Sequence, residues 1–154
     1  MKPEDEYSQL RKKYKELPEL KWLENNFDFS FDKEGINPLW QVMISISHKL
    51  NDTVKNDIEP LISGSESYDT WIEKRMFTKD ERDELSELYR ELKAVIWESK
   101  KLDIEYSEKD FIDWISDTAK FWESKKEELK KICNKIAKGW KKQKPSEDGT
   151  VYHG

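Results

Sequence analysis

The chain has 154 residues, with 28 Lys and Arg against 33 Asp and Glu, and charged residues make up 40% of it. An ordinary domain has about 25% charged residues. The 7 Trp, 6 Tyr and 6 Phe exclude a fully disordered chain, because such chains are poor in aromatic residues. With five Gly and five Pro, the turn residues of an all-β fold are missing. Length and composition therefore predict one charged helical domain.

Three further classes are excluded by simple patterns. No run of about 18 apolar residues exists, so no transmembrane helix is predicted. The first residues mix acidic and basic side chains without an apolar stretch, which predicts no secretory signal. Cys133 is the single cysteine, so no intrachain disulfide or thiolate metal cluster is expected. We expect a soluble cytoplasmic protein.

The first predicted helix starts at Pro3, which suits a first helical turn. Its apolar stripe consists of Tyr7, Leu10, Tyr14 and Leu17. We expect Pro18 to end or kink this helix, because the proline ring clashes with the preceding turn. A short second piece is expected over residues 20–27, and residues 25–38 are expected to form a loop with aromatic anchors.

The next helix is predicted from about Pro38 to about Ile58, with Pro60 and the Ser-Gly-Ser stretch at 63–65 ending it. Its apolar residues recur at steps of three or four: Leu39, Met43, Ile46, Leu50, Val54 and Ile58. A short helical element with two aromatic residues is expected over residues 68–72.

Two N-terminal capping signals mark the remaining helices. Thr78 with Glu81 matches a capping box before an apolar stripe from Leu85 to Ile96. Ser107 with Asp110 gives an analogous signal after a turn expected at 103–106. The last helix is predicted over about 108–142, on the order of 50 Å long at 1.5 Å per residue.

The last helix has an uneven apolar pattern. Ile115, Trp122, Leu129 and Ile136 keep a seven-residue spacing, but a polar run occupies residues 123–128. We expect this helix to pack in two places and to be exposed, or to bend, between them. Together the elements predict an all-α antiparallel bundle of about four principal helices with a long C-terminal helix. Residues 1–144 would form one domain, its N-terminal helix being a member or an arm, and residues 145–154 a flexible tail.

Charge is segregated along the chain. Residues 1–119 hold 18 basic and 28 acidic residues, a balance of −10, whereas residues 120–144 hold ten Lys and three Glu, a balance of +7. Lysines neutralise phosphates and an aromatic ring stacks on a base, so the basic end is a candidate nucleic-acid surface. The alternative is a solvated helix end whose lysines complement the helix dipole. The candidate residues are Lys130, Lys131, Lys135, Lys138, Trp140, Lys141, Lys142 and Lys144.

The acidic remainder favours a protein partner with a basic surface, because complementary charges steer association. Trp22, Trp40 and Trp71 are candidate interface anchors, since Trp is enriched in binding hot spots. The alternative is that these rings belong to the core.

Two carboxylate pairs offer an enzymatic alternative. Glu84 and Glu87 are three apart on one predicted helix, and Asp110 and Asp113 are three apart on the next. Facing carboxylates on adjacent helices hold Mg²⁺ in phosphoryl chemistry. The pattern resembles the all-α nucleotide pyrophosphohydrolases, whose helices carry paired Glu-x-x-Glu and Glu-x-x-Asp motifs. Here the second pair lacks the expected Glu, and Asp110 is also explained as a capping residue.

No cofactor is predicted, because the five glycines are isolated and give no phosphate-binding loop. His48 is expected on a helix surface and Cys133 as a buried thiol. The leading hypothesis is a non-enzymatic helical protein that binds and regulates or inhibits another macromolecule, most simply a protein. The alternatives are a nucleic-acid-contacting subunit of a ribonucleoprotein or DNA complex and a Mg²⁺-dependent nucleotide hydrolase. In size and class the chain is similar to the small all-helical subunits of CRISPR effector complexes, without a shared motif.

Overall fold

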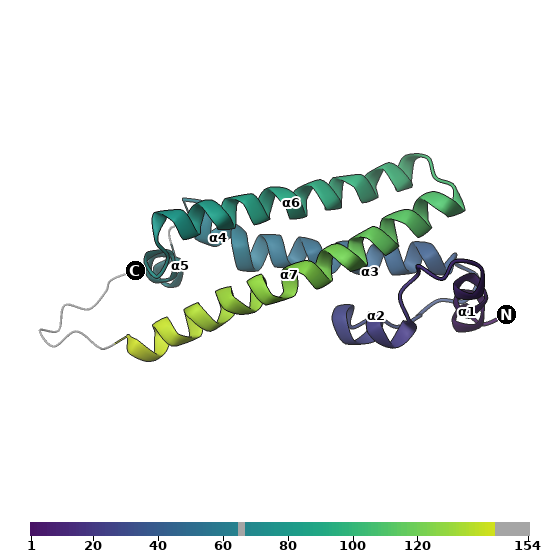
Figure 1. Ribbon diagram of the computed structural model, residues 1–154, viewed down its shortest axis with the longest axis horizontal. Helices are drawn as coiled ribbons and strands as arrows, with labels where there is room; N and C mark the ends of the chain where they lie inside the picture. The colour runs from purple at the N-terminus through teal and green to yellow at the C-terminus, as the bar shows by residue number, and fades with distance from the viewer. Residues whose placement is uncertain (65–66, 144–154) are drawn as a thin grey trace, which may run out of the picture.

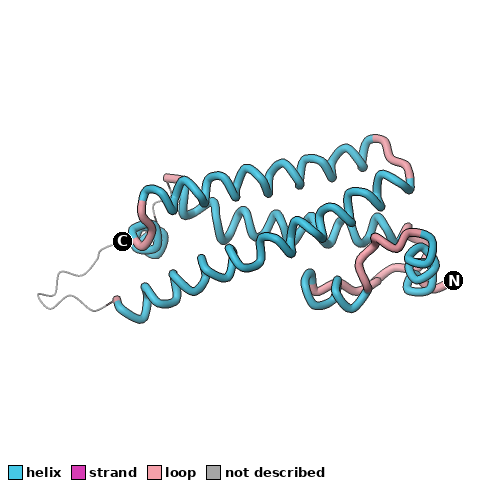
Figure 2. Tube along the Cα trace, viewed as in Figure 1, coloured by secondary structure: helices cyan, strands magenta, loops and turns pink. Residues whose placement is uncertain are grey.

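The computed structural model describes residues 1–64 and 67–143, which form helices and no strands (Figure 2). This confirms the predicted all-α class. In chain order the elements are α1 (Pro3–Lys13), α2 (Leu20–Phe27), α3 (Pro38–Asp52), the π-helical segment η1 (Thr53–Ile58), α4 (Glu59–Ile62), α5 (Tyr68–Arg75), α6 (Lys79–Ile104) and α7 (Glu108–Lys142).

Three long helical segments build the body: the run α3–η1–α4, α6 and α7 (Figure 1). α6 runs antiparallel to both others, so α3 and α7 point in the same direction. The short helices α1 and α2 pack at one end, and α5 lies at the other beside α4. The finer prediction of about four principal helices is not confirmed, because beside the three long segments the described residues form only short helices.

The core lies between the three long segments. Ile46 and Leu50 of α3, Leu92 of α6 and Ile112 and Ile115 of α7 are all fully buried. Burying such a side chain stabilises the fold by about 1.5–3 kcal/mol. Two polar contacts set the register of the long segments. The Ser47 hydroxyl donates to the Ser99 hydroxyl at 3.1 Å, and the Trp114 Nε1–H donates to the Val95 carbonyl at 3.1 Å.

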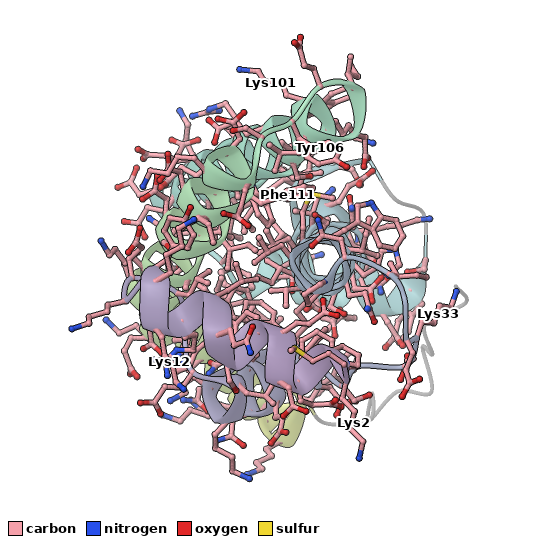
Figure 3. The ribbon with its side chains drawn as sticks, turned by 90° about the vertical axis from the view of Figure 1, so that its right-hand side faces the viewer. Lys2, Lys12, Lys33, Lys101, Tyr106 and Phe111 are labelled. Carbon is pink, nitrogen blue, oxygen red and sulfur yellow. The ribbon has the colours of Figure 1, made fainter. Side chains whose placement is uncertain are left out.

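The first helix ends earlier than expected, at Lys13, so Tyr14 and Leu17 lie beyond it. A proline disfavours helical geometry in the residue before it, and the turn ahead of Pro18 is held by side chains instead. The Tyr7 hydroxyl donates to the Pro18 carbonyl at 2.6 Å, and Arg11 Nε donates to the Leu17 carbonyl at 3.1 Å. Tyr7 and Leu17 are each 1% exposed, so α1 is packed across the end of the bundle rather than extended as an arm (Figure 3).

The helix that begins at Pro38 does not end before Pro60, so that prediction was wrong. The chain stays helical to Ile62 by passing through η1, where the Glu59 amide donates to the Val54 carbonyl five residues earlier. In an α-helix a proline has no amide hydrogen to donate, and its ring clashes with the carbonyl four residues before it. The wider π turn accommodates Pro60 because it changes the hydrogen-bond spacing just before the proline. Thr53 Oγ1 donates to the Lys49 carbonyl at 2.9 Å, within this change of register.

Both predicted capping boxes are present. Thr78 and Glu81 exchange hydrogen bonds at the start of α6, and Ser107 and Asp110 do so at the start of α7. α6 extends to Ile104, so the connection to α7 is shorter than the turn expected at 103–106. Within it Tyr106 packs on Phe111, with ring centroids 4.8 Å apart (Figure 3). In the described part of the chain, no helix has both the length and the apolar character needed to cross a membrane.

Candidate functional site

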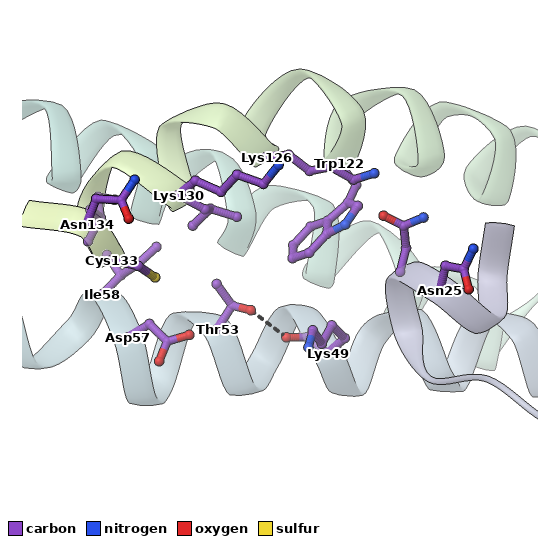
Figure 4. Close-up of a pocket in the computed structure, with 13 residues that line it drawn as sticks. Asn25, Lys49, Thr53, Asp57, Ile58, Trp122, Lys126, Lys130, Cys133 and Asn134 are labelled. Atoms are coloured by element: carbon purple, nitrogen blue, oxygen red, sulfur yellow. Dashed lines mark hydrogen bonds between the residues drawn. The ribbon is translucent and has the colours of Figure 1, made fainter. Parts of the chain in front are cut away.

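A groove of about 460 Å³ lies between the run α3–η1 and the second half of α7, at the end of α2 (Figure 4). We call it the π groove, because η1 forms much of one wall. Its lining residues are Asn25, Asn26, Lys49, Thr53, Asp57, Ile58, Trp122, Lys126, Leu129, Lys130, Ile132, Cys133 and Asn134.

The π groove continues the seat of α2. α2 packs on α3 and against α7, where Phe27 lies 5.3 Å from Trp122 and 5.5 Å from Trp22, measured between ring centroids. Trp22 Nε1–H donates to Glu123 of α7 at 2.6 Å. α2 then stops at Phe27, and Asp28 turns the chain away with a left-handed φ of 51°. The fourth position of the bundle is thus occupied along the first half of α7 and open along the second.

The inner surface of the π groove is apolar. Ile58 is fully buried, Trp122 and Ile132 are 7% and 9% exposed, and Leu129 is half-buried. A groove of this kind favours an apolar occupant, because covering the half-buried side chains removes them from water.

The edge of the π groove is polar and mostly basic, with Lys49 on α3 and Lys126 and Lys130 on α7 (Figure 4). Lys126 pairs with Glu123 at 2.6 Å, and Lys130 pairs with Glu127 at 3.4 Å. Such exposed ion pairs contribute little stability, so an occupant can exchange them readily.

Among the described residues, Asp57 is the only carboxylate that lines the π groove. Burial raises the pKa of its carboxyl, and the charge of Asp52 adds to this, while Lys49 acts in the opposite direction. η1 is what places Asp57 and Ile58 on this wall, and π-helical turns occur frequently at functional sites.

Cys133 and His48 are both exposed to solvent. Cys133 is exposed and lines the π groove, so the expectation of a buried thiol was wrong. The second half of α7 has no described helix over it at this point, which leaves the thiol in contact with solvent. His48 is exposed on α3, as expected.

The predicted nucleic-acid residues of α7 are partly engaged within the chain. Lys135 pairs with Glu81 at 2.5 Å, and Trp140 Nε1–H donates to Glu73 of α5 at 2.8 Å. The Trp140 ring is half-buried against α5 instead of standing free. Lys131, Lys138, Lys141 and Lys142 are exposed. Lys144 and the tail predicted from residue 145 lie outside the described residues.

The three tryptophans proposed as interface anchors differ in exposure. Trp22 is half-buried in the contact between α2 and α7, whereas Trp40 and Trp71 are 37% and 47% exposed. The Arg75 guanidinium lies over the Trp71 ring, 4.6 Å from its centroid. Trp97 of α6, which was not among the residues predicted from the sequence, is more exposed than these three rings, at 60%. Plotting α6 as a helical wheel would have placed it outside the apolar stripe.

The structure does not bring the two carboxylate pairs together. Glu84 and Glu87 lie beside the second half of α7, between the levels of the Glu91–Lys125 and Glu81–Lys135 contacts. Asp110 and Asp113 lie at the start of α7, at least 12 residues or roughly 18 Å before Lys125. Asp110 caps α7, and Asp113 pairs with Lys109 at 2.9 Å. Within residues 1–64 and 67–143, no three His, Cys, Asp or Glu side chains are grouped to hold a metal ion.

Comparison with protein-family models, with curated proteins and with solved structures gives no match to this chain.

Proposed function

We propose that this protein is a non-enzymatic interaction protein that binds an amphipathic helix of a partner protein in the π groove. The observation behind the proposal is the half-occupied fourth position of the bundle: α2 fills it beside Trp122 and leaves it open beside Leu129 and Ile132. A helix laid along this opening would continue the packing that α2 begins. Helix-in-groove binding is a recurrent mode of peptide recognition.

The partner helix should be apolar on the side that meets Leu129, Trp122 and Ile132. Its flanks should be acidic, because Lys49, Lys126 and Lys130 edge the π groove and charge complementarity sets orientation and association rate. This reverses the sign expected from the acidic total of residues 1–119, which favoured a partner with a basic surface. The total is a poor guide here because the described lining of the π groove holds three lysines and one carboxylate.

The native thiol makes the proposal directly testable. Cys133 is the single cysteine and lines the π groove, so a thiol-reactive photocrosslinker attached to it probes the occupant in place. In native lysate we expect one predominant crosslinked partner, whose crosslinked peptide has a helical apolar stripe flanked by Asp or Glu. Crosslinking to a basic or non-helical segment would contradict the proposal.

A pair of variants separates the groove from the rest of α7. Leu129→Glu places a charge on the apolar wall and should reduce capture of that partner at least tenfold. Ser124→Glu makes the same change of charge at an exposed position of α7 outside the groove lining and should leave capture unchanged. Circular dichroism checks that both variants keep the helical content of the wild type. Equal capture by the wild type and Leu129→Glu would rule out the π groove as the site.

A further inference from the structure

α6 carries opposite charges on its two flanks. Glu84, Glu87, Glu91 and Glu98 recur at steps of three, four and seven and form an acidic flank. This flank lies on the α7 side, because Glu91 pairs with Lys125 of α7 at 2.9 Å. The other flank carries Arg90, Lys93, Trp97, Lys100 and Ile104, at steps of three and four. We call this second set the basic flank of α6.

Ion pairs distinguish the basic flank from α7. Among the described residues, none of Arg90, Lys93 and Lys100 has a carboxylate within ion-pair distance, in contrast to Lys125, Lys130 and Lys135 of α7. Asp83 and Asp103 lie near its two ends. Its central part is therefore a run of cations that no carboxylate of residues 1–64 and 67–143 pairs with.

Aromatic rings alternate with these cations. Lys93 Nζ lies 5.9 Å from the centroid of Tyr89, and Lys100 Nζ lies 5.1 Å from the centroid of Trp97. Trp97 is 60% exposed and Ile104 is 86% exposed. A tryptophan this exposed contributes little to the core, so its position is not explained by packing.

From this arrangement we propose that the basic flank of α6 binds single-stranded nucleic acid. Lysine and arginine would neutralise the phosphates, and the Trp97 indole would stack on a base, which is the combination that sequence-tolerant single-strand binding uses. A protein partner would instead need a contiguous apolar patch at the centre of the interface. On the basic flank the rings are separated by cations, which favours a nucleic-acid strand over a protein.

The site differs from the basic C-terminal end of α7 that the sequence suggested. There Lys135 and Lys130 are paired with glutamates, and the indole N–H of Trp140 is bonded to Glu73. The basic flank has lysines without a described ion-pair partner and an accessible Trp97 ring. At the end of α7, two lysines are paired with glutamates and the Trp140 ring is half-buried.

Fluorescence anisotropy with labelled oligo-dT and oligo-U tests the proposal and separates DNA from RNA. Trp97→Ala should weaken binding by about 5- to 150-fold, the loss expected for one stacked base. Lys93→Gln combined with Lys100→Gln should weaken binding and reduce the magnitude of the salt slope by about 1.4, as expected for two lost phosphate contacts on a single strand. Trp97 and Lys100 are exposed and Lys93 is half-buried, and circular dichroism checks that the variants stay folded.

The matched control is Lys138→Gln combined with Lys142→Gln, which removes the same charge from exposed positions near the end of α7. It should leave most of the binding intact. Loss of binding in this control but not in the α6 variant would overturn the proposal in favour of the C-terminal end. Binding of poly-L-glutamate as tight as that of the oligonucleotides would also overturn it, because polyglutamate has charge but no bases. Absence of oligonucleotide binding at low salt would do the same.

Discussion

The two halves of α7 belong to one continuous helix but have different surroundings. In residues 108–122 the helix buries eight side chains: Phe111, Ile112, Trp114, Ile115, Ser116, Thr118, Ala119 and Trp122. In residues 123–142 it buries only Ile132. The first half packs inside the bundle beside α2, and the second extends toward the end where α5 lies (Figure 1). The second half also forms one wall of the π groove.

This difference shows that neighbours, more than apolar spacing, determine burial. Ile115, Trp122, Leu129 and Ile136 keep one seven-residue spacing through both halves, yet the first two are buried and the last two are half-buried. The second half is joined to the body by the buried Ile132, by the half-buried Leu129 and Ile136, and by polar contacts of Lys125, Lys135 and Trp140. Each such polar contact near the surface contributes little stability. The half that stabilises the fold and the half that offers the π groove are thus separate.

The largest predicted effect is on the first half of α7. Ile115→Ala removes a fully buried side chain from the centre of the core and should lower the free energy of unfolding by about 2–5 kcal/mol, because a cavity remains where the side chain packed. Urea unfolding followed by circular dichroism measures this loss.

Leu129→Ala is the matched change in the second half, where the side chain is half-buried in the wall of the π groove. It should cost clearly less, because solvent already reaches this position and the lost burial is smaller. Equal losses for the two variants would show that the second half of α7 is packed as tightly as the first.

A smaller effect is expected at the start of α7. The Ser107 hydroxyl accepts a hydrogen bond from the Asp110 amide at 3.2 Å, and Ser107→Ala should therefore cost about 1 kcal/mol. The measurement is the midpoint of urea unfolding at constant slope. Ser124→Ala, at an exposed site on the same helix, should change stability by less than about 0.5 kcal/mol. A loss at Ser124 as large as that at Ser107 would remove the argument for capping.

Local signals along the sequence predicted the helices well. The Thr78 and Ser107 capping boxes and the bounds of α7 follow from residues within one turn of each other. The prediction that Pro60 ends its helix was wrong. A π turn upstream of a proline depends on how the surrounding helices hold the backbone, which the local sequence does not show. The early end of α1 likewise depends on a distant contact, the hydrogen bond of Tyr7 with Pro18.

Sites were harder to predict than helices, because they depend on which side of a helix its neighbours cover. The π groove exists because α2 stops at Phe27, and nothing near Leu129 or Cys133 in the sequence indicates that. The basic flank of α6 was hidden by summing charge along the chain, since Glu91 and Lys93 are two residues apart in sequence but lie on different sides of the helix. The paired carboxylates at 84–87 and 110–113 had suitable spacings but lie at different levels of the bundle.

The smallest predicted effect concerns the polar connection of the second half of α7 to α6. The hydrogen bond from Lys135, with further bonds from Thr78, lowers the pKa of Glu81 from an ordinary 4.5 to about 2. The carboxylate therefore stabilises the folded state above about pH 4.5, and this contribution is lost as the pH falls toward 2. Glu81→Gln should lower the Tm at pH 6 while matching the wild type near pH 2, as thermal melts at several pH values would measure. Lys135→Gln should shrink the same pH dependence, because it removes the main cause of the lowered pKa. A Tm difference between wild type and Glu81→Gln that stays constant from pH 6 to 2 would show that this contact does not hold the second half of α7.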